Sequence, residues 1–104
     1  MNLYELIPVG RENRIHRSEL ANRFIIAGAI TPVGDTNRDM MNLLHEIRKE
    51  TVVISSGRGY YRPDSKDKEE LKHYIGKERH RIAEINSYLI MATKVLADME
   101  AGRI

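Results

Sequence analysis

Apolar residues recur at helical spacing from the start of the chain. Leu3, Leu6 and Ile7 fall on one face of a short helix, which Pro8 and Gly10 would end. The sequence therefore predicts an amino-terminal helix that presents a small apolar face to a core.

A second helical pattern follows a turn or short extended piece at residues 11–16. Ser18 has a side chain suited to the N-cap of this helix. Leu20, Phe24 and Ala27 lie at helical spacing and define its predicted buried face.

A third helix is predicted over residues 36–50, after a connector at residues 29–35 that contains proline and glycine. Thr36 is suited to cap this helix, and Asp39 lies favourably in its first turn. At about 100° per residue, four apolar side chains share the predicted core face: Met40, Leu43, Leu44 and Ile47. Four polar side chains, with no carboxylate among them, occupy roughly the opposite arc: Arg38, Asn42, His45 and Lys49.

Two short runs rich in β-branched and aromatic residues follow, at residues 51–55 and 60–62. The glycines at 57 and 59 supply the backbone freedom of a tight turn, so the two runs are predicted to form a hairpin. Arg58 would then stand clear of the body at the tip. One of the two tyrosines on the returning strand is expected to pack inward and the other to point its hydroxyl outward.

The pattern is again helical from Ser65 to about Ala101, with Asp64 or Ser65 as the predicted cap and Gly102 as the stop. Its apolar steps fit heptads with a glutamate at one core position. Ile75, Ile82, Leu89 and Leu96 occupy the a positions, and Leu71, Glu78, Ile85, Ala92 and Met99 occupy the d positions.

The polar, proline-containing run at residues 62–70 divides the chain into two predicted domains, residues 1–63 and 64–104. A helix of about 36 residues spans roughly 54 Å, which a small domain cannot cover. We therefore predict a homodimer through the helix's apolar stripe: Ile75, Ile82, Ile85, Leu89, Leu96 and Met99. The alternative is a break near Gly76 or residues 86–87, with the helix folding back on its own domain.

Composition narrows the class of protein. The chain has 104 residues and no cysteine, which excludes disulfides and thiolate metal sites and fits a reducing cytoplasm. No basic segment leading into an apolar run marks a signal peptide, and the longest mostly apolar stretch, residues 24–30, is far below membrane-spanning length. We expect a cytoplasmic protein with no membrane partner.

The chain also shows little that suggests catalysis. Its four histidines are not clustered with carboxylates, so no metal site is predicted. No phosphate-binding glycine loop with its lysine and no Ser-His-acid spacing is present. The sequence predicts a protein that is not an enzyme and needs no cofactor.

The distribution of charge along the chain, rather than the net charge, favours a nucleic-acid partner. The formal net charge is only +2, but residues 1–62 contain eight arginines and one lysine. Arginine's planar fork suits phosphates and base edges. A solvated polar face is normal for an amphipathic helix; the absence of carboxylates on the polar arc of residues 36–50 favours a nucleic-acid contact.

The runs "LYELIPVGREN", "NRDMMNLLHEIRKE" and "ISSGRGYY", in this order, resemble the winged helix-turn-helix domains of small phage and prophage-type bacterial proteins. The resemblance covers residues 3–62 and implies a three-helix core with a β-wing. It makes residues 36–50 the recognition helix and residues 57–59 the wing tip, with Ile15 near a short first strand. The interval from Glu19 to Thr36 is about nine residues longer than the short turn usual in such domains.

The predicted fold is thus mainly α with a small β-hairpin, a winged helix-turn-helix followed by a long carboxy-terminal helix. The predicted function is sequence-specific binding of double-stranded DNA, as a transcriptional regulator or replication accessory factor of a phage or mobile element. Arg38, Asn42 and His45 would read the major groove. The predicted phosphate contacts are Arg17, Lys49, Arg58 and Arg62. The alternative is a protein-interaction adaptor on the same scaffold, with a protein partner in place of DNA.

Overall fold

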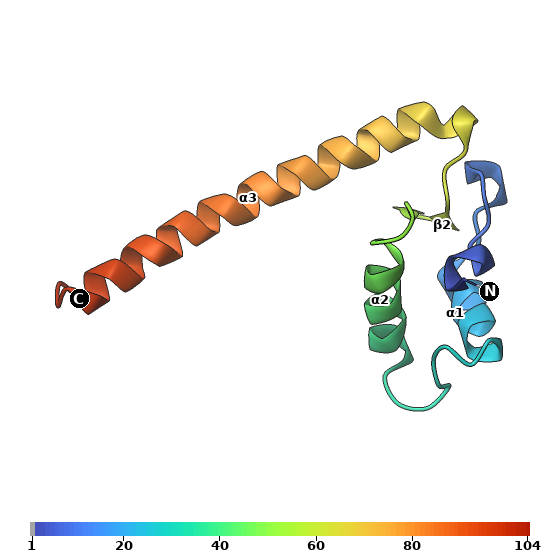
Figure 1. Cartoon of the computed structure of the whole chain (residues 1–104), viewed down its shortest axis with the longest axis horizontal. Helices are drawn as coiled ribbons and strands as arrows, with labels where there is room; N and C mark the ends of the chain where they lie inside the picture. Colours follow the sequence, from blue (N-terminus) through green and yellow to red (C-terminus); the bar gives the residue numbers. More distant parts are fainter. Residues whose placement is uncertain (1) are drawn as a thin grey trace. The chain divides into compact units, whose positions relative to one another are not determined.

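The computed structural model describes residues 2–104 and contains two compact units, one extending to Leu71 and one from Lys72 to Ile104. The predicted fold class is confirmed: the chain is mostly helical, with one two-stranded antiparallel hairpin and a long carboxy-terminal helix (Figure 1). Met1, which belongs to the predicted first domain, lies outside the described residues.

The first unit begins with two short 3-10 helices, η1 (Leu3–Leu6) and η2 (Arg11–Asn13). The predicted amino-terminal α-helix is therefore a single 3-10 turn, because Pro8 and Gly10 leave no room for another turn. The three-helix core that the resemblance implied is reduced to two α-helices in this unit. Ile7, just after η1, is nevertheless fully buried.

Helix α1 (Arg17–Ile26) begins at a different cap from the one predicted. The N-cap is His16, whose Nδ1 accepts a hydrogen bond of 3.2 Å from the backbone N–H of Ser18. Because the His16 imidazole accepts the hydrogen bond from this backbone N–H, the prediction of Ser18 as the N-cap was wrong. Leu20 and Phe24 form the buried face as predicted, whereas Ala27 is exposed because the helix has ended.

Helix α2 (Thr36–Ile47) lies beside α1 (Figure 1). Its N-cap is Asp35 rather than the predicted Thr36, since the Asp35 carboxylate accepts a 3.0 Å hydrogen bond from the backbone N–H of Arg38. The helix ends at Ile47, before the predicted Glu50. The segment between α1 and α2 is a loop of turns and bends, so the extra length does not extend α1.

Strands β1 (Ile54–Ser56) and β2 (Gly59–Tyr61) form the predicted hairpin, with Ile54 opposite Tyr61 and Ser56 opposite Gly59. Ile15 adds an antiparallel bridge to Tyr60 on the other side of β2, as the resemblance implied for a first strand. Tyr60 belongs to the core cluster and Tyr61 is buried as well, so the two rings do not divide into one inward and one outward side chain as expected.

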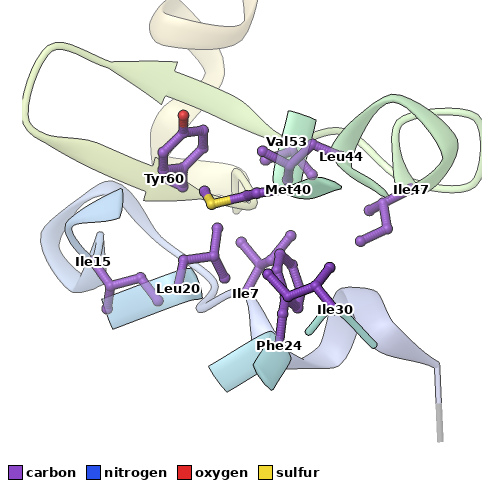
Figure 2. Close-up of a cluster of buried hydrophobic side chains, with 10 residues drawn as sticks. All are labelled: Ile7, Ile15, Leu20, Phe24, Ile30, Met40, Leu44, Ile47, Val53 and Tyr60. Carbon is purple, nitrogen blue, oxygen red and sulfur yellow. The ribbon is translucent and has the colours of Figure 1, made fainter. Parts of the chain in front are cut away.

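Ten buried side chains form the core of the first unit. Figure 2 shows them converging from the amino-terminal segment, α1, the loop after it, α2, and the hairpin with the residue that precedes it. They are Ile7, Ile15, Leu20, Phe24, Ile30, Met40, Leu44, Ile47, Val53 and Tyr60. The predicted core face of α2 is confirmed at Met40, Leu44 and Ile47, while Leu43 is partly buried against the cluster.

The second unit is formed by helix α3 (Lys68–Glu100), whose first turn still belongs to the first unit. Asp64 caps the preceding 3-10 turn η3 (Ser65–Asp67) with a capping box. The helix continues through Gly76 and residues 86–87, so the alternative of a break there is wrong. Gly102, at a φ of 74°, follows the helix as the predicted stop.

The two units divide inside α3 because its start is bonded to the amino-terminal segment. Asp67 is buried and accepts a 3.2 Å hydrogen bond from the backbone N–H of Arg11. The Arg11 guanidinium also lies 3.7 Å from the Glu70 carboxylate. These contacts hold the linker after Pro63 against the first unit.

Candidate nucleic-acid interface

The polar face of α2 lies on the surface. Arg38, Asn42 and His45 are all exposed, at positions i, i+4 and i+7 of the helix. Among residues 2–104, neither the Arg38 guanidinium nor the His45 imidazole forms a salt bridge. The buried face on the other side fixes the helix, so these three side chains are presented together to solvent.

Lys49 is placed differently from the other members of the predicted set. It follows the end of α2, and its Nζ lies 3.1 Å and 3.2 Å from the two carboxylate oxygens of Glu46. A carboxylate therefore reaches this end of the polar face. Both side chains are exposed, and an exposed pair of this kind contributes at most about 1 kcal/mol, so a phosphate can replace Glu46 as the partner.

A crevice lies between the amino-terminal ends of α1 and α2. Its lining is His16, Arg17, Ser18, Ala21, Thr36, Asn37 and Met40. The amino-terminal ends of helices carry partial positive charge and free backbone N–H groups, which favour anions. Arg17 adds a full positive charge to this crevice.

The Arg17 guanidinium is only partly satisfied by the protein. Its Nη2 is buried and has no hydrogen-bond partner within residues 2–104. A buried donor left unpaired costs free energy, and because this atom is buried, a ligand can reach it only if the Arg17 side chain moves. The structure thus places Arg17 next to two helix amino termini, at which His16 and Asp35 already accept hydrogen bonds from the backbone N–H groups of Ser18 and Arg38.

The hairpin tip consists of Gly57 and Arg58, and both are exposed. Neither Gly57 nor Gly59 adopts a positive φ, so the expected role of both glycines in the turn conformation is wrong. Gly59 is required for another reason: a Cβ there would lie 2.6 Å from the backbone oxygen of Ile15. Arg58 stands at the tip with no salt bridge among the described residues.

Arg62 is engaged within the first unit. Its Nε donates a 2.8 Å hydrogen bond to the carbonyl of Ile7, and its guanidinium lies 5.2 Å from the centroid of the Tyr4 ring. The backbone N–H of Arg62 also donates to the carbonyl of Pro8 at 2.7 Å. The side chain predicted to contact phosphate is thus used to fasten the amino-terminal segment to β2.

One titratable group near the end of the hairpin has a shifted pKa. Burial raises the pKa of Tyr61 above its usual value of 10.0, and the negative charges of Asp67 and Glu70 add to the rise. Arg11 and Arg14 act in the opposite direction. Tyr61 is therefore a neutral core side chain, and its hydroxyl is not poised for acid-base chemistry at neutral pH.

Sequence reasoning missed the crevice at the two helix amino termini. It found Arg17 as a cation but not its neighbours His16, Thr36 and Asn37. The signal that points to the crevice is that a basic residue begins one helix and a threonine begins the next. Their proximity depends on the packing of α1 against α2 through Leu20 and Met40, which local patterns do not show.

Within residues 2–104, no group of three His, Cys, Asp or Glu side chains is arranged to hold a metal ion. Over the same residues, no helix has both the length and the apolar character needed to cross a bilayer. Comparison of the chain with protein-family models, with curated proteins and with solved structures finds no match.

Proposed function

We propose that the first unit is a winged helix-turn-helix module that binds double-stranded DNA, with α2 as the recognition helix and the β1–β2 hairpin as the wing. The observation that carries this proposal is the exposed polar face of α2, on which Arg38, Asn42 and His45 stand together without internal ion pairs. Arginine and asparagine are the side chains that form bidentate contacts with guanine and adenine.

The crevice at the helix amino termini supports a role in holding the DNA backbone. The positive charge of Arg17 beside two helix amino termini favours a phosphate. Lys49 and Arg58 are the further proposed phosphate contacts. Arg62 is not assigned a phosphate contact in this proposal, because its Nε is bonded to the Ile7 carbonyl and its guanidinium lies over Tyr4.

The module would act by binding alone, as a transcriptional regulator or replication accessory factor of phage or mobile-element type. Self-association through α3 would bring two recognition helices to one DNA molecule and raise affinity without new contacts in each module. This homodimer is part of the proposal.

A second candidate function is supported by a specific observation. Ile26, the last residue of α1, is 87% exposed, and Val33, in the long loop that follows, is 78% exposed. Exposed apolar side chains of this size are typical of protein contacts when they occur together. An adaptor that binds a protein partner through this loop, without DNA, is therefore the alternative.

A mobility-shift titration with duplex DNA over a series of salt concentrations tests the proposal. Contacts from Arg17, Lys49 and Arg58 to three phosphates predict a slope of log affinity against log salt of about −3 per subunit. No complex with duplex DNA at low salt would exclude DNA binding and favour the adaptor. Selection from random duplexes with the purified chain would then identify the preferred sequence.

A further inference from the structure

The apolar stripe of α3 has no cover within the second unit, which is a single helix. More than half of each of five stripe side chains is exposed, and Ile75 is 40% exposed. The five are Ile82, Ile85, Leu89, Leu96 and Met99. A single helix cannot bury its own apolar stripe, so another protein surface must cover it. The charged residues that flank the stripe indicate which surface that is.

Charged side chains of both signs lie along the first half of α3, and two carboxylates, Asp98 and Glu100, lie at its end. In the heptad frame with Ile82 and Leu89 at a, Arg79 and Glu100 both occupy e positions, which flank the seam between paired helices. Neither forms a salt bridge within residues 2–104.

Parallel pairing of two copies makes poor use of these charges. It places Glu78, at a d position, against Glu78 of the second copy in the middle of the seam. In a parallel pair, each e position faces the g position of the preceding heptad on the second copy. Arg79 therefore faces Tyr74, and Glu100 faces Val95. The parallel dimer therefore contains one repulsive core pair and gains no ion pair across the seam.

Antiparallel pairing resolves both problems in one register. When Leu89 faces Ala92 of the second copy, Ile85 faces Leu96 and Ile82 faces Met99. Symmetry repeats each layer, which gives six consecutive apolar layers. The e positions then face each other, so Arg79 meets Glu100 twice, and at the g positions Tyr88 meets Val95. Glu78 falls outside the apolar layers and lies 3.6 Å from Arg81 of its own chain.

A shift by one heptad is less favourable. It sets Glu78 against Leu96 of the second copy and replaces the Arg79–Glu100 pair by Arg79 against Thr93. The Glu78 carboxylate would then lose hydration against an apolar side chain and gain no partner beyond Arg81 of its own chain. The charge pattern thus selects both the direction of pairing and its register.

We propose that α3 pairs with α3 of a second copy as an antiparallel coiled coil centred between Leu89 and Ala92. The pairing rests on the proposed self-association of α3 but not on DNA binding. It places the two first units at opposite ends of the pair, with the two Lys68 positions about 68 Å apart along the axis at 1.5 Å per residue. Parallel pairing would bring both to the same end.

Disulfide trapping in the full-length chain tests the direction, because the chain has no cysteine of its own. Ile82→Cys and Met99→Cys variants are mixed in equal amounts in a glutathione redox buffer without DNA. The antiparallel pair yields the mixed 82–99 disulfide as the main product, identified by mass spectrometry. Ser87→Cys, at an f position on the outer face, is the control and stays uncrosslinked.

Predominant 82–82 and 99–99 disulfides in that mixture would overturn the antiparallel arrangement. Crosslinking no greater than that of the Ser87→Cys control would overturn self-association through this stripe. Both readings are independent of the DNA titration, so failure of this proposal and failure of the proposed function are distinguishable.

Charge reversal at the e positions supplies a second readout. Arg79→Glu places four carboxylates in two facing pairs and should weaken the dimer about tenfold in sedimentation equilibrium, since each exposed pair contributes modestly. The double variant Arg79→Glu/Glu100→Arg should restore the parent dissociation constant. An unchanged dissociation constant in Arg79→Glu would contradict the facing of Arg79 and Glu100.

Discussion

Gly59 and Ile15 approach so closely that no side chain fits between them. A Cβ at residue 59 would lie 2.6 Å from the carbonyl oxygen of Ile15. Two hydrogen bonds hold the approach, with Ile15 N–H donating to the Tyr60 carbonyl at 3.1 Å and Tyr60 N–H donating to the Ile15 carbonyl at 2.9 Å. This pairing attaches the hairpin to the amino-terminal segment and buries Tyr60.

Replacing Gly59 by alanine should destabilise the first unit by about 1–3 kcal/mol, because backbone or strand must shift to admit the methyl group. Gly57→Ala is the matched control. Its Cβ would meet nothing within 4 Å and its φ is not positive, so the change should stay within about 0.5 kcal/mol. Urea unfolding of both variants measures the difference, and equal stabilities would contradict the close approach.

Replacement of Arg62 by alanine should destabilise the chain, whereas replacement of Arg58 by alanine should not. Arg62→Ala removes the charged hydrogen bond to the Ile7 carbonyl and the contact with Tyr4, so it should destabilise the chain by about 1–3 kcal/mol. Arg58→Ala touches no internal contact and should leave the free energy of unfolding within about 0.5 kcal/mol of the parent. A stable Arg62→Ala variant with impaired DNA binding would return Arg62 to the contact set.

DNA binding should separate Arg58 from Asn42. Arg58→Ala removes a proposed phosphate contact, so it should weaken binding to every duplex by a similar factor and make the salt slope shallower by about 1. Asn42→Ala removes a proposed base contact and should reduce discrimination at one base position by about 1–3 kcal/mol. Titration of each variant against the selected sequence and its single-base substitutions measures both effects.

Affinities equal to the parent in both variants would contradict the proposed roles of the hairpin tip and of α2. Uniform weakening by Asn42→Ala across all sequences would make Asn42 a backbone contact rather than a base contact.

Periodicity predicted the core face of α2 because the burial of Met40, Leu44 and Ile47 follows from helical geometry and from the helix having one apolar side. The caps were misplaced because several polar side chains compete for the same amide. His16 and Asp35, rather than Ser18 and Thr36, are the N-caps because of local backbone angles that a residue pattern does not reveal.

The site was predictable where a residue's exposure follows from its own helix, as for Arg38, Asn42 and His45. The site was not predictable where a segment distant in the sequence determines whether a side chain is exposed. Arg62 is engaged by Ile7, 55 residues away, and Tyr60 is buried in a core to which Ile15, far away in the sequence, contributes. Contacts of this kind depend on chain topology, which has no local signature.

The cap of α2 provides a further test. Asp35→Ala removes the hydrogen bond to the Arg38 N–H and should cost about 1 kcal/mol of stability, with fraying of the turn that carries Arg38. Thr36→Ala is the control, because Thr36 does not serve as the cap and the change should stay within about 0.5 kcal/mol. Thermal unfolding followed by circular dichroism measures both, and a larger loss in Thr36→Ala would show that the cap is misassigned.

Tyr61 should make the first unit sensitive to alkaline pH. Its pKa in the folded chain is raised above the usual 10.0, so the folded state holds the phenolic proton more tightly than the unfolded state does. The stability from this neutral, buried hydroxyl is complete below about pH 10 and is lost as the pH rises through the folded-state pKa. Tyr61→Phe removes the titrating group and keeps the buried ring.

Urea unfolding of the parent and of Tyr61→Phe between pH 8 and pH 11 measures this effect. The difference in unfolding free energy, parent minus variant, should be constant up to about pH 10 and should then fall, because only the parent must give up its phenolic proton on unfolding. A difference that stays constant over the whole range would contradict the raised pKa. A difference that rises with pH would mean that the folded state stabilises the phenolate, against the burial and the neighbouring carboxylates of Asp67 and Glu70.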